Sequence, residues 1–213
     1  MKKIFINKLN HLISFVNPIM QLQIEDALVF RDLVFTIEDN LTFSINNKEI
    51  NLKKHMLKIE NCFNLDINDR KFVAFLYKKI LKQLTNEQRV NLLQIETLIY
   101  DLLDSIDKYS TFNLMYKQES DLTKLLKSFD LAFFEHDKIN YLDYLLDYLK
   151  VSLDVNDIKL VLSFNMLNLL TREEIKELSN ELFTLNLVLI DITYYNNKKD
   201  HERIIIDKDW CVF

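Results

Sequence analysis

The N-terminal part of the chain alternates short apolar runs with polar positions in a pattern that predicts strands and a helix. Residues 2–6 and 20–24 are β-favouring runs. Glu25 and Asp26 then introduce residues 26–37, whose apolar positions have helical spacing. Acidic side chains at the start of a helix lie at the positive end of its dipole. We therefore expect two strands followed by an amphipathic helix.

A β-hairpin is predicted directly after this helix. Residues 41–45 and 48–52 are β-favouring segments that flank Asn46 and Asn47. Tight hairpin turns need positive φ angles, which asparagine tolerates better than most other residues. The two asparagines therefore indicate a turn that is built without glycine.

The middle of the chain has helical periodicity over almost all of residues 53–151. We expect helices near residues 53–63, 68–84, 86–109, 119–129 and 138–151. In the first of them, Met56, Ile59 and Phe63 share one face, and lysines occupy the opposite face. Thr85 and Gln88 have the spacing of a capping box, which predicts the start of the long third helix.

The C-terminal part returns to an alternation of strands and helices. Residues 158–164 and 186–193 are continuous apolar runs, as expected of strands buried on both faces, and a predicted helix at 172–184 lies between them. Residues 203–206 and 210–213 are candidate edge strands. A strand–helix–strand unit of this length predicts parallel pairing.

The two ends of the chain therefore predict one α/β domain with a helical domain inserted into it. We expect a head domain with a mostly parallel sheet, made from residues 1–60 and 152–213. Residues 61–151 are expected to form an α-helical leg domain. No glycine- or serine-rich linker separates the two.

The chain contains no glycine and a single proline, which excludes several kinds of catalytic site. Phosphate-binding loops, nucleophile elbows and dinucleotide fingerprints need glycine where the backbone approaches the ligand or adopts φ > 0. Asp191 ends a predicted buried strand, where a Walker-B carboxylate would lie, but that role requires a phosphate loop opposite it. A polar residue at the end of a strand is the more ordinary interpretation.

The remaining reactive residue types form no catalytic or zinc-binding pattern. These residues are scattered along the chain: His11, His55, His136, His201, Cys62 and Cys211. They include no histidine pair at i,i+4 and no CxxC unit. We expect no enzyme activity, two buried thiols in a reducing cytoplasm, and no membrane span, because no uncharged apolar run approaches the ~20 residues that one requires.

The charge is unevenly distributed along the chain. The net charge is −5, yet residues 46–89 carry ten basic side chains against five acidic ones. Several of these lysines lie opposite the apolar face of a predicted helix, where they would suit contacts with nucleic-acid phosphates without reading bases. A solvated helix face is the commoner explanation on composition alone, and Phe75 among these lysines also hints at contact with another protein.

Several stretches, in their order and spacing, resemble one known family over nearly the whole chain. They are residues 22–34, 60–84, 122–133, 160–192 and 206–213. Within them, short polar anchors such as Asn165 and Thr171 accompany the hydrophobic pattern. On these features the chain resembles the Csn-two family, the accessory spacer-acquisition protein of type II-A CRISPR systems.

This resemblance implies a specific fold and function. Family members have an α/β head similar to a degenerate P-loop ATPase, with an inserted helical leg. They form homotetrameric rings that hold double-stranded DNA ends in a lysine-lined hole, beside the CRISPR integrase pair and the guide-RNA nuclease. Carried onto the basic faces of this chain, the resemblance gives the following candidate DNA-binding residues: Lys53, Lys54, Lys58, Lys71, Lys78 and Lys82.

The resemblance also implies Ca²⁺ binding by the leg, but the chain departs from the family there. Residues 112–119 read FNLMYKQE, with Asn113, Lys117 and Gln118 where carboxylates are expected. Carboxylates elsewhere in the leg have the oxygen ligands that Ca²⁺ prefers, although a solvated acidic face is the commoner explanation. Calcium binding is therefore either weakened or moved to the candidates Asp104, Asp107, Glu119 and Asp121.

The leading hypothesis is a non-catalytic ring that binds duplex DNA ends without sequence preference and uses no nucleotide. Two alternatives stay open. One is a degenerate P-loop-like ATPase that retains nucleotide chemistry at Asp191. The other is a protein-only scaffold without DNA binding, in which Phe75 and the acidic leg make the contacts.

Overall fold

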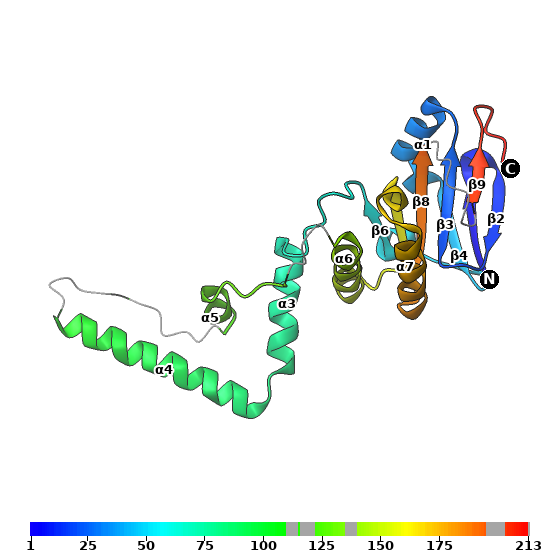
Figure 1. Ribbon diagram of the computed structural model, residues 1–213. Coiled ribbons are helices and arrows are strands. Elements are labelled where there is room, and N and C mark those ends of the chain that lie inside the picture. The colour runs from blue at the N-terminus through cyan, green and yellow to red at the C-terminus, as the bar shows by residue number, and fades with distance from the viewer. Residues whose placement is uncertain (110–114, 116–121, 135–139, 195–202, 213) are drawn as a thin grey trace. The chain divides into compact units, whose positions relative to one another are not determined.

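The chain forms two compact units, shown in a computed structural model (Figure 1). The structure describes residues 1–109, 115, 122–134, 140–194 and 203–212. Unit 1 comprises residues 1–67 and 135–213, and unit 2 comprises residues 68–134. We call them the head unit and the leg unit, and the leg unit is inserted in the sequence of the head unit.

The head unit contains most of the regular structure. Its strands are β1 (Lys2–Ile6), β2 (His11–Phe15), β3 (Ile19–Ile24), β4 (Leu41–Ile45), β5 (Lys48–Glu49), β6 (Met56–Ile59), β7 (Leu160–Phe164), β8 (Val188–Tyr194) and β9 (Arg203–Ile206). Its helices are α1 (Ala27–Asn40), α2 (Leu52–His55), α6 (Tyr141–Asn156) and α7 (Arg172–Thr184), with short 3₁₀ turns η1 (Asn7–Leu9) and η2 (Met166–Leu169).

The centre of the head unit is a five-stranded, all-parallel sheet in the order β6-β7-β8-β3-β9. Every residue of β3 is buried, and β7 and β8 are buried over nearly their whole length. Strands that are covered on both faces read as continuous apolar runs, which is why β7 and β8 could be recognised in the sequence. The predicted α/β head with a mostly parallel sheet is confirmed.

Two layers cover this sheet. On one face, α6 and α7 bury leucines, among them Leu145 and Leu178, against Val161 of β7 and Leu189 of β8. On the other face, α1 and a small antiparallel sheet in the order β2-β1-β4-β5 pack against the alternate residues of the same strands. The head is therefore a three-layer domain, and its polar sites lie at the ends of the strands.

The antiparallel sheet contains the predicted hairpin and one strand that the sequence analysis missed. Asn46 and Asn47, with φ of 50° and 61°, connect β4 to β5, so the prediction of a glycine-free turn is confirmed. Strand β2 lies between the two strands that were predicted at residues 2–6 and 20–24, and it pairs with β1 over five residue pairs. A short exposed strand with mixed polarity gives only a weak periodic signal.

The predicted helix at residues 53–63 is wrong. The chain makes only one helical turn, α2, and then enters strand β6, in which Met56 pairs with Leu160 and Ile59 with Ser163 of β7. A run of four mainly apolar residues does not distinguish a strand from a helix by periodicity, and pairing with a buried strand decides the outcome here. Residues 210–212 also form no strand, since Val212 makes only an isolated bridge to Ile206.

Helix α6 belongs to the head unit, whereas the sequence analysis placed residues up to 151 in the leg. Its apolar face packs against the parallel sheet, where Leu145 and Leu149 have no exposed surface. The hydroxyl group of Tyr144 also accepts a hydrogen bond from the backbone N–H of Leu65 at 2.6 Å. An amphipathic helix shows from its sequence that one face is buried, but not which domain buries it.

The leg unit contains α3 (Arg70–Gln83), α4 (Asn86–Tyr109) and α5 (Leu122–Ser128). Asp69 caps α3 by accepting the N–H groups of Lys71 and Phe72, at 2.7 and 2.9 Å. The predicted capping box at the start of α4 is confirmed, because Thr85 and Gln88 exchange hydrogen bonds of 2.9 and 3.2 Å. In the described part of the chain, no helix has the length and apolar character that crossing a membrane would require.

Candidate nucleic-acid interface and neighbouring sites

The leg unit presents a basic face on α3. Lys71, Lys78 and Lys82 are exposed and are separated by seven and four residues, a spacing that places them on one side of a helix. The opposite side buries Phe72 and Tyr77, and the hydroxyl group of Tyr77 donates a hydrogen bond of 3.0 Å to the carbonyl of Leu131. Packing of this apolar side fixes the direction in which the lysines project.

Phe75 lies within the basic face of α3. Its side chain is partly exposed, and the Nζ atom of Lys79 lies 5.8 Å from the centroid of its ring. A cation at this distance is attracted by the electron-rich face of the ring. The face therefore combines lysines with one aromatic ring, a composition that fits the sugar–phosphate backbone of a nucleic acid or an acidic protein surface.

The head unit contributes two further exposed lysines. Lys53 and Lys54 lie in the single turn of α2, directly before β6. Lys53 also lines a pocket that contains Glu38 and Glu49, so two carboxylates lie near its side chain. These lysines and those of α3 belong to different units.

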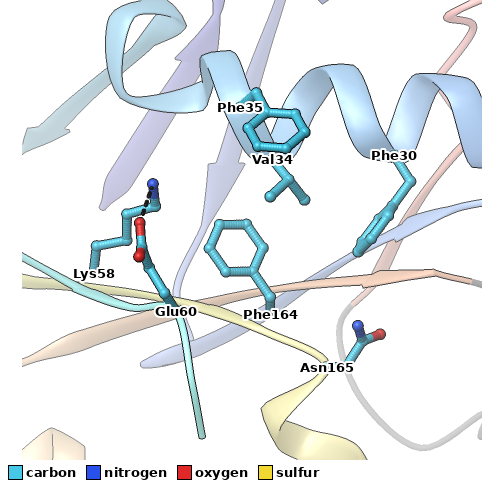
Figure 2. Close-up of a pocket in the computed structure, with 7 residues that line it drawn as sticks. All are labelled: Phe30, Val34, Phe35, Lys58, Glu60, Phe164 and Asn165. Atoms are coloured by element: carbon cyan, nitrogen blue, oxygen red, sulfur yellow. Dashed lines mark ion pairs between the residues drawn. The ribbon is translucent and has the colours of Figure 1, made fainter.

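Lys58 is placed differently from the other candidates. It lies on β6 and not on a helix, and its Nζ atom contacts Glu38 at 2.6 Å and Glu60 at 2.9 Å. Figure 2 shows the ion pair with Glu60. The hydrogen bond to Glu38 raises the pKa of the Lys58 ammonium, with a smaller effect in the same direction from Glu60. Only 22% of its side chain is exposed. Its charge is thus already matched by two carboxylates of the head.

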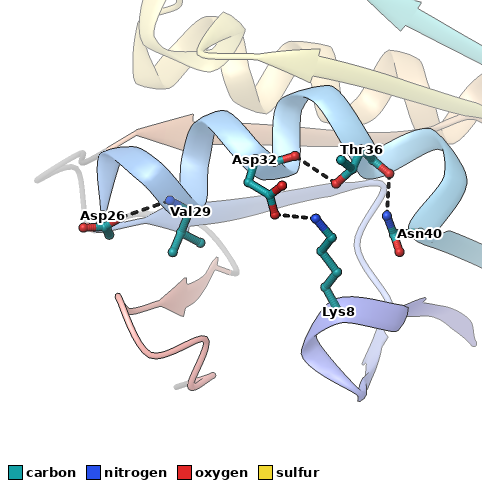
Figure 3. A network of polar contacts seen from close by, with 6 residues as sticks. All are labelled: Lys8, Asp26, Val29, Asp32, Thr36 and Asn40. Atoms are coloured by element: carbon teal, nitrogen blue, oxygen red, sulfur yellow. Dashed lines mark hydrogen bonds and ion pairs between the residues drawn. The ribbon is translucent and has the colours of Figure 1, made fainter.

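The start of α1 is capped by a carboxylate of the chain itself. In a P-loop protein the phosphates bind where a strand passes into a helix, as β3 passes into α1 here. At this position Asp26 accepts hydrogen bonds from the N–H groups of Leu28, at 2.8 Å, and Val29, at 3.0 Å. Figure 3 shows the bond from Val29. The carboxylate occupies the donors that an anion would use, and the neighbouring Glu25 adds a second negative charge.

Asp191 is a buried structural carboxylate. It has no exposed surface and accepts hydrogen bonds from the hydroxyl groups of Ser163, at 2.7 Å, and Thr193, at 3.1 Å. The N–H groups of Met166 and Leu167 also donate to it, at 3.0 and 3.1 Å, so it caps η2. Burial raises the pKa of Asp191, while these donors act in the opposite direction. Both carboxylate oxygens already have partners within the protein.

An aromatic pocket that the sequence analysis missed lies between α1 and the ends of β6 and β7. It has a volume of about 390 Å³ and is lined by Phe30, Val34, Phe35, Lys58, Glu60, Phe164 and Asn165 (Figure 2). The Nζ atom of Lys58 lies over the Phe164 ring, 5.9 Å from the ring centroid. The three rings come from positions 30, 35 and 164, and distant residues of this kind give no joint signal in a single sequence.

The candidate calcium ligands are only partly described. Asp104 and Asp107 are exposed and lie one turn apart on α4, on the same side of the helix. Glu119 and Asp121 lie outside the described residues. No group of three or more histidine, cysteine, aspartate or glutamate side chains is close enough to hold a metal ion among the residues that the structure describes. Two carboxylates supply fewer than the six to eight oxygens that Ca²⁺ takes.

The two cysteines differ from each other. Cys62 is buried, as expected, and its thiol donates to the carbonyl of Phe164 at 3.4 Å. Burial raises the pKa of Cys62 to about 11, with a smaller effect from the negative charge of Asp191. Cys211 is exposed, which corrects the expectation that both thiols are buried.

The fold and these sites define an α/β protein with a helical insertion, in which a carboxylate caps the helix that follows β3. The family model for CRISPR-associated protein (Cas_Csn2) matches residues 35–210. The chain therefore belongs to the Csn-two family of CRISPR-associated proteins, as its sequence resemblance predicted. A comparison with curated proteins gives no match.

Proposed function

We propose that the protein binds the ends of double-stranded DNA without sequence preference, as a homotetrameric ring in the cytoplasm, during CRISPR spacer acquisition. Membership of a CRISPR-associated family supports the setting. The observation that carries the proposal is the basic face of α3, with Lys71, Lys78 and Lys82. In this role the ring acts beside the integrase pair and the guide-RNA nuclease.

The dimensions of the α3 face suit a DNA backbone. Lys71 and Lys82 are eleven residues apart on a helix, which corresponds to about 16 Å along its axis. A duplex carries one negative charge per ~1.7 Å of axis, so each copy would meet several phosphates. Repeating this face in four copies would concentrate positive charge around a channel, even though each copy has a net charge of −5.

The apolar surface of α4 supports assembly of several copies. Ile95, Ile99, Leu102 and Ile106 are separated by four, three and four residues, the spacing of a helix–helix seam, and each is at least 40% exposed. Leu98 beside them is 68% exposed. Exposed apolar stripes of this length mark contact surfaces in soluble proteins.

The protein is proposed to act without catalysis and without a nucleotide. Asp26 occupies the helix N-terminus that phosphates would need, and Asp191 is engaged by four donors of the protein itself. These contacts disfavour the ATPase alternative. A calorimetric titration with Mg-ATP is expected to give no heat of binding.

Calcium binding is proposed for the acidic side of α4. Asp104 and Asp107 offer carboxylate oxygens on one helix face, and Glu119 and Asp121 follow in the sequence. A bound cation would neutralise this acidic surface. Replacing both aspartates by asparagine is expected to weaken Ca²⁺ binding at least tenfold by calorimetry, and unchanged affinity would remove these residues from the site.

The salt dependence of DNA binding tests the role of the lysines. Each phosphate that a lysine neutralises adds about −0.9 to the slope of log affinity against log salt concentration. The double variant Lys78→Glu, Lys82→Glu is expected to lower both the affinity and this slope. The matched control is the double variant Lys176→Glu, Lys208→Glu, at two exposed positions of the head unit, which changes the net charge by the same amount. An equal effect of both variants would show that only net charge matters and would contradict a defined lysine surface.

A further inference from the structure

The antiparallel sheet of the head has two very different edges. At one edge, β5 is only two residues long and consists of Lys48 and Glu49. At the other edge, β2 has five residues, His11–Phe15, and pairs only with β1 among the strands that the structure describes. Short length and charged side chains are the usual protection of an edge strand against pairing with another chain. The edge at β5 has both protections.

Strand β2 has neither protection. It reads HLISF, without Asp, Glu, Lys, Arg or Pro, whereas the edge strands of the parallel sheet carry Lys58 and Arg203. Its side chains alternate regularly, with Ile13 and Phe15 buried in the core and Leu12 and Ser14 exposed. Leu12 is 54% exposed, and Val16, just beyond the strand, is 78% exposed. This edge is suited to the addition of another strand.

We propose that β2 pairs with β2 of a second copy, antiparallel about a twofold axis, so that two four-stranded sheets join into one of eight strands. With Ser14 opposite Ser14, Leu12 of each copy faces Val16 of the other on the exposed side. Ile13 then faces Phe15 on the buried side. A shift that centres the pair on Ile13 instead places Leu12 opposite Ser14 and leaves Val16 uncovered, so side-chain pairing selects one register.

The charges near this edge permit self-pairing. The cation nearest this edge is Lys2, whose ammonium group donates to the carbonyls of Val16, at 3.1 Å, and Asn17, at 3.2 Å, within its own chain. On the exposed side of the sheet the nearest cation is Lys3, which lies opposite Ser14 on β1 and donates to Asn47 at 2.8 Å. In the proposed sheet the two Lys3 residues are three strand spacings apart, or about 14 Å. This exceeds the Debye length of ~10 Å at 0.1 M salt, so their repulsion is screened. The contact extends the proposed ring assembly by naming one subunit interface, and its test uses no DNA.

A cysteine at the twofold axis tests the pairing directly. Ser14→Cys is made in a Cys211→Ser background, which leaves only the buried Cys62. Directly opposite side chains have Cβ atoms 4.5–5.5 Å apart, near the separation that a disulfide requires. Mild oxidation is expected to convert most of this variant into a covalent dimer. The control Ser44→Cys lies on the inner strand β4 of the same sheet and is expected to remain uncrosslinked.

Charge pairs at the same positions provide the second test. Leu12→Lys with Val16→Lys places like charges opposite each other and is expected to weaken self-association at least tenfold in analytical ultracentrifugation. Leu12→Lys with Val16→Glu places opposite charges together and is expected to retain association. Leu12 and Val16 are both exposed, so the circular dichroism spectra of the two variants should match that of the unmodified protein.

The outcomes separate this contact from the proposed function. Equal, weak crosslinking of Ser14→Cys and Ser44→Cys in an assembled protein would overturn the β2 pairing, and DNA-end binding by that protein would leave the ring proposal standing. Identical masses for the two charge variants would also overturn the β2 pairing. The edge would then be available to a strand of a different protein. Crosslinking through Ser14→Cys without DNA binding would support the contact and contradict the DNA role.

Discussion

Asp191 shows how a single buried carboxylate can be structural although its position resembles that of a catalytic one. Four hydrogen bonds converge on its oxygens, two of them from backbone N–H groups at the start of η2. The sequence predicted Asp191 at the end of a buried strand, whereas it lies in the middle of β8. The sequence also favoured a polar strand residue over a Mg²⁺ ligand. The hydrogen bonds from Met166 and Leu167 could not be predicted from the sequence, because only the pairing of β7 with β8 brings these N–H groups to Asp191.

Replacing Asp191 is therefore expected to affect stability and not nucleotide chemistry. Asp191→Ala would leave four donors without an acceptor inside the head, at a cost of about 3–5 kcal/mol in the free energy of unfolding. Ser163→Ala removes one donor and is expected to cost about 1 kcal/mol. Urea unfolding followed by circular dichroism measures both values. A loss below 1 kcal/mol for Asp191→Ala would contradict the capping role.

The two thiols are expected to react at very different rates. At pH 8, a thiol whose pKa is about 11 is almost entirely protonated, and Cys62 is also buried, so iodoacetamide should modify Cys211 alone. Because the thiolate is the reactive form, labelling of Cys62 should rise only toward pH 11 or on unfolding. Mass spectrometry of peptides from native and urea-treated protein distinguishes the two sites. Equal labelling in the native protein would show that Cys62 is accessible.

At the level of elements, strong periodicity was a reliable guide and short segments were not. Helices α1, α3, α4 and α7 and the buried strands β3, β7 and β8 occur where their patterns predicted them. The strands β2 and β6 were missed. They have five and four residues, which is too short for the alternation of a strand to be distinguished from the spacing of a helix. The error at β6 also moved Lys58 from a predicted helix face to a strand, where two carboxylates neutralise it.

The apolar stripe of α4 gives a prediction at this scale. Leu98→Asp with Leu102→Asp should reduce the mass of the assembly in light scattering, because two charges would have to be buried in a helix–helix contact. Thermal unfolding should change little, since both side chains are already exposed. The control Thr97→Asp lies at an exposed position on the opposite side of the same helix and should leave the mass unchanged. An unchanged mass for the leucine variant would show that α4 makes no contact between copies.

At the scale of the whole molecule, sequence patterns predicted the α/β class, the inserted helices and the family. They did not predict the domain to which α6 belongs. The strands that cover its apolar face are distant from it in the sequence, so the local pattern does not identify them. Of the six candidate DNA-binding lysines, those on α3 share one face as expected, while Lys53, Lys54 and Lys58 do not form the second helical face. The aromatic pocket arises only from the folded head.

The central claim is that lysines from several copies surround a duplex that enters through its free end. The most direct test is a gel shift at physiological salt that compares linear DNA with a covalently closed circle of the same sequence. We expect the linear form to be retained, and a restriction cut in the circle to restore binding. Equal retention of the linear and the closed form would show that binding needs no free DNA end and would contradict the threaded ring.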